Sequence, residues 1–280
     1  MLAESRRKHL LELISRQGFV TLEELVKTLG VSESTVRRDL ESLDQTGTIK
    51  RTHGGAVCSA ELKLMPALDD RVSAQAAEKR AIGMLTASLI EDGETVLLDG
   101  GTTTLEVARA LLGRPVQVVT NSLPIAGLLA SSKENDLILI GGYVSPRTGV
   151  AMGPLAIASM ESIRVRKAIL GAGGIVAEGI YNSNLLLVET ERKMMERGQE
   201  VMIVADHSKF GKLSLTWLCG LGDVDSLVVD SALPEVYRTL LDLSGVTTHF
   251  AELVRDSPEL GSVLNRNGQS RPTALSRNES

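Results

Sequence analysis

Apolar residues in the first thirty positions recur with the spacing of amphipathic helices. Those among positions 1–17 approximate a single stripe, which predicts a first helix there. Thr21 and Glu24 have the spacing of a capping box in front of a second apolar run. Gly30 is expected to close this short second helix, because glycine adopts the left-handed conformation that a sharp turn requires.

A third helix is predicted over residues 32–45, with Ser32 as its N-cap. Val36, Leu40 and Leu43 share one face of it and are expected to point inward. The polar and basic side chains of the opposite face are Ser34, Thr35, Arg37 and Arg38. The turn between the last two helices predicts a helix-turn-helix, whose recognition helix binds duplex DNA. The alternative is that the two arginines form an ordinary solvated surface.

The segment after Gly47 has the composition of a β-hairpin. Residues 48–53 are rich in β-branched and basic side chains and end at two glycines. We expect this hairpin to be the wing of a winged helix-turn-helix, with Lys50, Arg51 and His53 contacting phosphates or the minor groove. Helix spacing, cap and wing together favour DNA binding over the solvated-surface alternative.

From about residue 75, short aliphatic runs alternate with helical patterns. The expected strands are 94–98, 115–119, 137–140, 167–170, 200–204 and 226–229. The expected helices are 75–91, 104–112, 123–131, 154–163 and 187–198. This alternation predicts an α/β domain with a mostly parallel sheet covered by helices, which is typical of a sensor or an enzyme.

Small, polar and ionisable residues follow most of the predicted strands. Because the carboxyl ends of parallel strands meet at one edge of a sheet, this edge is expected to bind a small polar ligand. The predicted effector-binding residues are Asp99, Gly100, Gly101, Thr102, Thr103, Thr104, Asn121, Gly141, Gly142, Gly173, Glu189 and Lys209. The later glycines are equally compatible with close-packed turns.

The loop after the first of these strands has the features of a phosphate site. Gly100 and Gly101 let backbone N–H groups approach an anion, and the threonines after them add hydroxyl donors. A helix expected to begin near Leu105 presents its positive end, and Lys209 is placed to reach the same anion as a point charge. The loop matches neither a Walker A motif nor GxGxxG, which disfavours nucleoside triphosphates and NAD. A tight turn with a solvated lysine is the alternative.

Composition limits the class of protein further. The 280 residues are 43% hydrophobic and carry a net charge of −5. Residues 1–56 hold nine basic and eight acidic side chains, so basic charge is expected to gather on one face rather than in excess. Seven aromatic residues are too few for the stacking platforms of RNA binders. With no apolar run near ~18 residues and no signal-peptide pattern, a cytoplasmic protein without a membrane partner is expected.

Two cysteines, Cys58 and Cys219, cluster neither with each other nor with the histidines. We therefore expect reduced thiols, no metal and no cofactor. The domain boundaries predicted from these patterns are a winged helix-turn-helix over 1–57, a connector over 58–74, an α/β effector domain over 75–252 and a disordered tail over 253–280.

Together these segments resemble the DeoR/GlpR-type family of bacterial transcriptional repressors. The matching stretches are 31–32, 35–40, 51–56, 78–80, 101–104, 120–121, 141–142 and 206–211. The resemblance implies a winged helix-turn-helix followed by a sensor domain similar to the ribose-5-phosphate isomerase fold. In typical members the sensor binds a sugar phosphate, which releases repression of a catabolic operon. One departure is Glu191, which stands where many members have a lysine.

These observations predict a repressor of a carbohydrate-utilisation operon that a phosphorylated sugar releases from duplex operator DNA. A homo-oligomer, dimer or tetramer, is expected because paired half-sites mirror a two-fold protein. The alternative is a sugar-phosphate isomerase with an accessory DNA-binding domain. Isomerisation needs a carboxylate base, for which Asp206 and Glu189 are candidates. Residues 171–174 instead place small residues, three of them glycine, where such isomerases have acidic ones.

Overall fold

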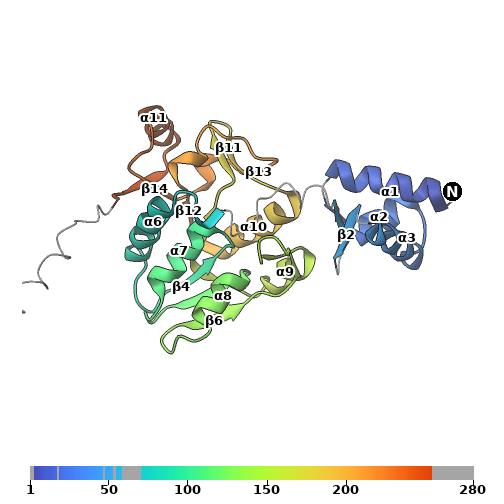
Figure 1. Cartoon of the computed structure of the whole chain (residues 1–280), viewed down its shortest axis with the longest axis horizontal. Coiled ribbons are helices and arrows are strands. Elements are labelled where there is room, and N and C mark those ends of the chain that lie inside the picture. The colour runs from blue at the N-terminus through green and yellow to red at the C-terminus, as the bar shows by residue number, and fades with distance from the viewer. Residues whose placement is uncertain (1–2, 18, 47, 53–54, 59–70, 254–280) are drawn as a thin grey trace, which may run out of the picture.

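The computed structural model describes residues 3–17, 19–46, 48–52, 55–58 and 71–253. The N-terminal elements are α1 (Ala3–Gln17), β1 (Phe19–Thr21), α2 (Leu22–Leu29), α3 (Glu33–Gln45), β2 (Ile49–Thr52) and β3 (Gly55–Cys58) (Figure 1). Three helices and a small sheet of order β1-β3-β2 enclose a core of their own. The fully buried aliphatic residues of this core include Leu10, Ile14, Leu25, Val36 and Ile49.

Local sequence signals place the two helices of the helix-turn-helix. The Thr21 hydroxyl accepts a hydrogen bond from the Glu24 backbone, and the Glu24 carboxylate accepts one from the Thr21 N–H. Gly30 ends α2 in the left-handed conformation at φ 64°. The Ser32 hydroxyl accepts from the Thr35 N–H and begins α3. The predicted capping box, glycine turn and N-cap are therefore confirmed.

The wing is a three-stranded sheet. Strands β2 and β3 pair antiparallel as predicted, with Thr52 opposite Gly55. Strand β1 pairs with β3 and was not predicted, because three residues are too few to show a periodicity. The predicted wing contact His53 lies outside the described residues.

A seven-stranded, wholly parallel sheet forms the second part of the chain, in the order β15-β14-β12-β9-β4-β5-β6. Its strands are β4 (Thr95–Leu98), β5 (Gln117–Thr120), β6 (Asp136–Leu139), β9 (Val165–Gly171), β12 (Gly198–Val204), β14 (Ser226–Asp230) and β15 (Thr247–Ala251). The helices are α6 (Ala76–Ser88), α7 (Thr102–Leu111), α8 (Leu123–Leu129), α9 (Pro154–Ser159), α10 (Leu185–Arg197) and α11 (Glu235–Ser244).

Helices cover both faces of this sheet (Figure 1). Helices α6, α7 and α8 bury their apolar residues in one core, and α9, α10 and α11 contribute to the other. Successive residues of β4 alternate between the two cores, with Val96 and Leu98 in one and Leu97 in the other. This arrangement is the α/β architecture that the alternating pattern predicted.

Some elements of the second part were not predicted. They are β15, α11 and the small antiparallel sheets made by β7 (Tyr143–Val144), β8 (Ala151–Met152), β10 (Gly174–Val176), β11 (Gly179–Asn182) and β13 (Thr216–Cys219). Strand β15 reads Thr-Thr-His-Phe-Ala and lacks an aliphatic run, and most of these strands are short. Residues 59–70 of the predicted connector and 254–280 of the predicted tail lie outside the described residues.

Within the described ranges, no helix combines the length and apolar character needed to cross a membrane. In the same residues, no group of three His, Cys, Asp or Glu side chains is placed to hold a metal ion. Cys219 is a buried free thiol.

Candidate DNA-binding surface and effector pocket

The outer face of α3 presents the polar residues that the helical spacing predicted. Ser34, Arg37 and Arg38 are exposed, and Thr35 is half-buried. Arg37 donates two hydrogen bonds to Glu33, one turn earlier, at 2.8 and 2.6 Å. Arg38 has no ion pair within the described residues, which leaves its guanidinium available for a phosphate or a base edge.

A buried ion pair orients α3. Asp39 lies beside the apolar face of the helix, and its carboxylate accepts a hydrogen bond from Arg6 of α1 at 2.5 Å. Arg7, also on α1, donates to Ser42 of α3 at 2.7 Å. These contacts tie the recognition helix to α1. These contacts were not predicted from the sequence, because Asp39 belongs to the same Arg-Arg-Asp run as the surface arginines.

Exposed ion pairs connect the wing to α3. Lys50 lies 3.4 Å from Asp44, and Arg51 lies 3.9 Å from Glu41. Both basic side chains are partly exposed, so each remains within reach of a phosphate beside the recognition helix.

We expect Arg38→Ala to weaken operator binding by about 1–3 kcal/mol if Arg38 reads a base, with relaxed preference at one position. A milder loss that is equal for all sequences identifies a phosphate contact instead. Fluorescence anisotropy with operator and scrambled duplexes measures both. Operator affinity unchanged in a folded Arg38→Ala chain contradicts the assignment.

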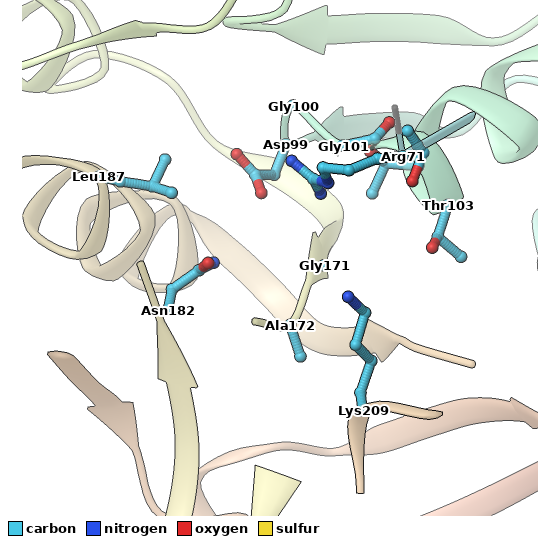
Figure 2. A pocket seen from close by; sticks show the side chains of 12 residues that line it. Arg71, Asp99, Gly100, Gly101, Thr103, Gly171, Ala172, Asn182, Leu187 and Lys209 are labelled. Carbon is cyan, nitrogen blue, oxygen red and sulfur yellow. Dashed lines mark hydrogen bonds between the residues drawn. The ribbon is translucent and has the colours of Figure 1, made fainter. Parts of the chain in front are cut away.

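The second part of the chain has a pocket at the carboxyl edge of its parallel sheet (Figure 2). The residues that line it are Arg71, Asp99, Gly100, Gly101, Thr102, Thr103, Thr104, Gly171, Ala172, Asn182, Leu187 and Lys209. They come from the segment before α6, the β4–α7 loop, the end of β9, β11, α10 and the turn after β12. The topology therefore brings residues more than 100 positions apart into one site.

The first turn of α7 forms the part of the pocket that was predicted from the sequence to bind an anion. This helix begins at Thr102, two residues before the predicted range 104–112, so the backbone N–H groups of all three threonines belong to its first turn. Gly100 has a packing role as well, since a Cβ there would lie 2.1 Å from a methyl group of Val150. The glycine is thus required by the fold and not only by a ligand.

Lys209 reaches the pocket from a short 3-10 helix, η1 (His207–Lys209). The Asp230 carboxylate fixes this turn, because its two oxygens lie 2.7 Å from the His207 N–H and from His207 Nδ1. Burial lowers the pKa of Lys209, and the nearby Asp206 opposes that shift. A lysine held beneath the surface in this way gains from an anionic partner.

Arg71 is the second cation of the pocket. It lies just before α6, and its carbonyl oxygen accepts a hydrogen bond at 2.6 Å from Lys79, a buried lysine of that helix. Burial lowers the pKa of Arg71, and the Asp99 carboxylate opposes that shift. Figure 2 shows the Arg71 guanidinium beside Asp99, with the Lys209 amine pointing into the same space.

Five of the predicted effector residues do not line the pocket. They are Asn121, Gly141, Gly142, Gly173 and Glu189.

Three of the five have roles in packing. The Asn121 amide donates to the Ala151 carbonyl at 2.9 Å, a Cβ on Gly142 would lie 3.0 Å from the Met152 carbonyl oxygen, and one on Gly173 would lie 2.9 Å from Asn182.

Glu189 lies two positions from Leu187 on α10. It is therefore turned away from the face that meets the pocket, since residues four apart share a helix face.

Two family models match the chain. The DeoR-like helix-turn-helix domain matches residues 6–61, and the DeoR C terminal sensor domain matches residues 74–231. The chain belongs to the DeoR family.

Relatives of this DeoR-family chain match along nearly their whole length. The HTH-type transcriptional repressor GlcR of Bacillus subtilis (strain 168) is 32% identical over 246 residues, 88% of this chain and 95% of that protein. The Glycerol-3-phosphate regulon repressor of Escherichia coli (strain K12) is 35% identical over 240 residues, 85% of this chain and 95% of that protein.

Among solved structures, ribose 5 phosphate isomerase A from Neisseria gonorrhoeae aligns over 49% of this chain and 53% of its own, at 16% identity and a TM-score of 0.36.

This DeoR-family chain is a DNA-binding transcriptional repressor and not an enzyme, as its helix-turn-helix domain and its repressor relatives show. The isomerase alternative is therefore set aside.

The pocket of this DeoR-family member also contains residues that were not predicted from the sequence to bind the effector. Arg71 was assigned to a connector, and Asn182 and Leu187 carry no motif. Gly171 and Ala172 were recognised only as a strand end. A clue for Arg71 was a basic residue directly after two aspartates, in a segment otherwise without periodicity.

Proposed function

We propose that this repressor controls a carbohydrate-utilisation operon and that a phosphorylated sugar, bound in the pocket, releases it from duplex operator DNA. Residues 1–57 serve as the DNA-reading domain, and residues 75–252 serve as the sensing domain together with Arg71. The protein acts in the cytoplasm as a homo-oligomer, because one small, nearly neutral DNA-binding domain makes few phosphate contacts. It needs no cofactor beside the sugar phosphate.

The observation that carries this proposal is the convergence of two half-buried cations on one helix N-terminus. Arg71 and Lys209 line the same small space as the first turn of α7. A phosphoryl group fits such a set, since the guanidinium binds two oxygens, the ammonium acts as a point charge and the backbone N–H groups complete the cradle. The name of the E. coli relative, which refers to the glycerol-3-phosphate regulon, is consistent with a phosphorylated ligand.

Arg71 supplies a route from the pocket to the DNA-binding domain. It is the first described residue of the predicted connector's C-terminal end, and Lys79 holds its backbone against α6. A phosphate bound by Arg71 therefore acts on the end of the segment that leads to the DNA-binding domain. The ligand releases the repressor from DNA to the extent that it binds the ligand-bound conformation of the chain more tightly than the conformation that binds DNA.

Paired ligands test the proposal. We expect glycerol 3-phosphate, D-glucose 6-phosphate or D-fructose 1-phosphate to raise the Tm of the full-length chain, and the matching unphosphorylated compounds to have no effect. A ligand at 100 times its Kd stabilises by about 2.7 kcal/mol. Differential scanning fluorimetry finds the ligand, and titration calorimetry compares the two forms. Equal affinity for a phosphorylated compound and its unphosphorylated form overturns the anion site.

A further inference from the structure

Two buried carboxyl groups, Asp99 and Glu191, lie on the Leu187 side of the pocket, where Asp99 adjoins the Arg71 guanidinium and Gly100 of the phosphate cradle. Asp99 directly follows β4 and is 2% exposed, and Glu191 on α10 is fully buried. Glu191 follows Leu187, a pocket residue, by one helical turn on the same face. It does not itself line the pocket but lies directly behind the residues that do.

Asp99 and Glu191 contact each other through their carboxyl groups. Each keeps one buried oxygen, Asp99 Oδ1 and Glu191 Oε2, with no hydrogen-bond donor among the described residues. The other oxygen of Glu191, Oε1, accepts a hydrogen bond from Asn182 Nδ2 at 2.5 Å. A single proton shared between the two carboxyl groups satisfies both orphaned oxygens and removes the repulsion of two adjacent carboxylates.

The proton belongs on Glu191 for structural reasons. Backbone N–H groups of Gly100 and Gly171 face the Asp99 carboxyl group, and the Arg71 guanidinium faces it from the pocket, so Asp99 carries the negative charge. The other ionisable groups near Glu191 are Arg192, which donates to the carbonyls of Trp217 and Leu218, and the thiol of Cys219. Glu191 is then a neutral donor to Asp99 and an acceptor from Asn182.

We propose that Glu191 is a positioning residue of the effector pocket: its protonated carboxyl group holds Asp99 and Asn182 in the orientation that binds the hydroxyl groups of a phosphorylated polyol. Figure 2 shows both side chains directed into the space beside Leu187. Carboxylate and amide groups side by side are suited to hydroxyls, which both donate and accept. The inference rests on the proposed function, since it assumes that the phosphoryl group occupies the end formed by Arg71 and Lys209.

The pH dependence has a defined sign. Burial raises the pKa of Glu191 well above its ordinary value, and burial raises the pKa of Asp99 to about 6. Both values are higher in the folded chain than in the unfolded one. The stability that the protonated pair contributes is therefore complete below pH 4 and is lost as the pH rises through the folded pKa values.

Two substitutions of similar size separate positioning from packing. In Glu191→Gln the amide can donate to Asp99 and accept from Asn182 without a titrating proton, whereas Glu191→Met fills the same space and can do neither. The full-length variants are titrated with inorganic phosphate and with glycerol 3-phosphate by calorimetry between pH 6 and 9. Thermal unfolding is followed over the same range without ligand.

At pH 7 we expect Glu191→Gln to bind glycerol 3-phosphate within about threefold of the parent chain, and Glu191→Met to bind it roughly tenfold more weakly. Both should bind inorganic phosphate as the parent does. The ratio of the parent's affinity to that of Glu191→Gln should fall as the pH rises, because only the parent loses the Glu191 proton. Ionisation of the probe affects both chains equally and therefore cancels in this ratio. The ligand-free Tm of the parent should fall more steeply with pH than that of Glu191→Gln.

Equal pH profiles for parent and Glu191→Gln, in affinity and in Tm, overturn the shared proton. Equal loss of inorganic phosphate and glycerol 3-phosphate binding in Glu191→Met shows a packing role and overturns positioning. Failure of the parent chain to bind either probe overturns the proposed anion site, and with it the positioning role. The ligand-free Tm then still decides whether the proton is shared, so the two failures remain distinguishable.

Discussion

Arg71→Ala and Lys209→Ala chains are expected to bind operator DNA as tightly as the parent and to stay bound when the phosphorylated effector is added. Each side chain supplies a cation at the anion end of the pocket, and neither belongs to the DNA-binding domain. Hydrogen bonds to charged groups contribute about 1.5–3 kcal/mol each, so effector affinity should fall roughly 10- to 150-fold per substitution. The phenotype is permanent repression.

Gel-shift titrations with and without effector measure this release directly. Lys212→Ala is the matched control, because Lys212 is exposed, lies near Lys209 and does not line the pocket. The control should release DNA at the same effector concentration as the parent. An effector response that survives both Arg71→Ala and Lys209→Ala contradicts the assignment of the anion site.

Asp39→Ala is expected to destabilise the DNA-binding domain and to leave the stability of the sensor domain unchanged. Its carboxylate is 8% exposed and pairs with the Arg6 guanidinium, which is 13% exposed. Removing the Asp39 carboxylate takes away a charged partner of Arg6 in a largely buried position, which is more destabilising than losing an exposed pair. For a domain of this size we expect the Tm to fall by on the order of 10 °C or more.

The control for Asp39→Ala is Glu33→Ala, which removes the exposed pair with Arg37 on the same helix. Exposed pairs one turn apart contribute little, so its Tm should remain within a few degrees of the parent. Calorimetric scans of the full-length chain resolve the two domains as separate transitions. Similar Tm changes in the two variants would falsify the structural role of Asp39.

Local signals made the helix-turn-helix predictable. The capping box at Thr21, the left-handed turn at Gly30 and the N-cap at Ser32 each act within four residues, so their effect can be inferred without the rest of the fold. The parallel sheet was predictable for a related reason. Most of its predicted strands are short, largely aliphatic runs with both faces buried, whereas β6 at the sheet edge exposes Ile138 and Leu139.

The pocket was only half predictable. Its anion loop and Lys209 follow strands and were found from the rule that ligands bind at the carboxyl edge. Arg71, Asn182 and Glu191 come from a connector segment, a short antiparallel strand and a helix, and only the tertiary fold brings them together. Glu191 stood out as a departure from the family's pattern, but its contact with Asp99 depends on how α10 packs against β9 and β12 of the sheet.

The two ends of the proposed pocket share the β4–α7 loop but draw their other side chains from different elements, and this difference bears on how such repressors diversify. The phosphate cradle depends on the first turn of α7 and on Gly100, where the close approach of Val150 leaves no room for a side chain. The hydroxyl end also depends on Asn182 of β11 and Glu191 of α10, neither of which belongs to the core of the DNA-binding domain in the part of the chain that the structure describes. After gene duplication, substitutions on α10 alone can redirect one copy to a new sugar while phosphate capture and operator recognition are inherited unchanged.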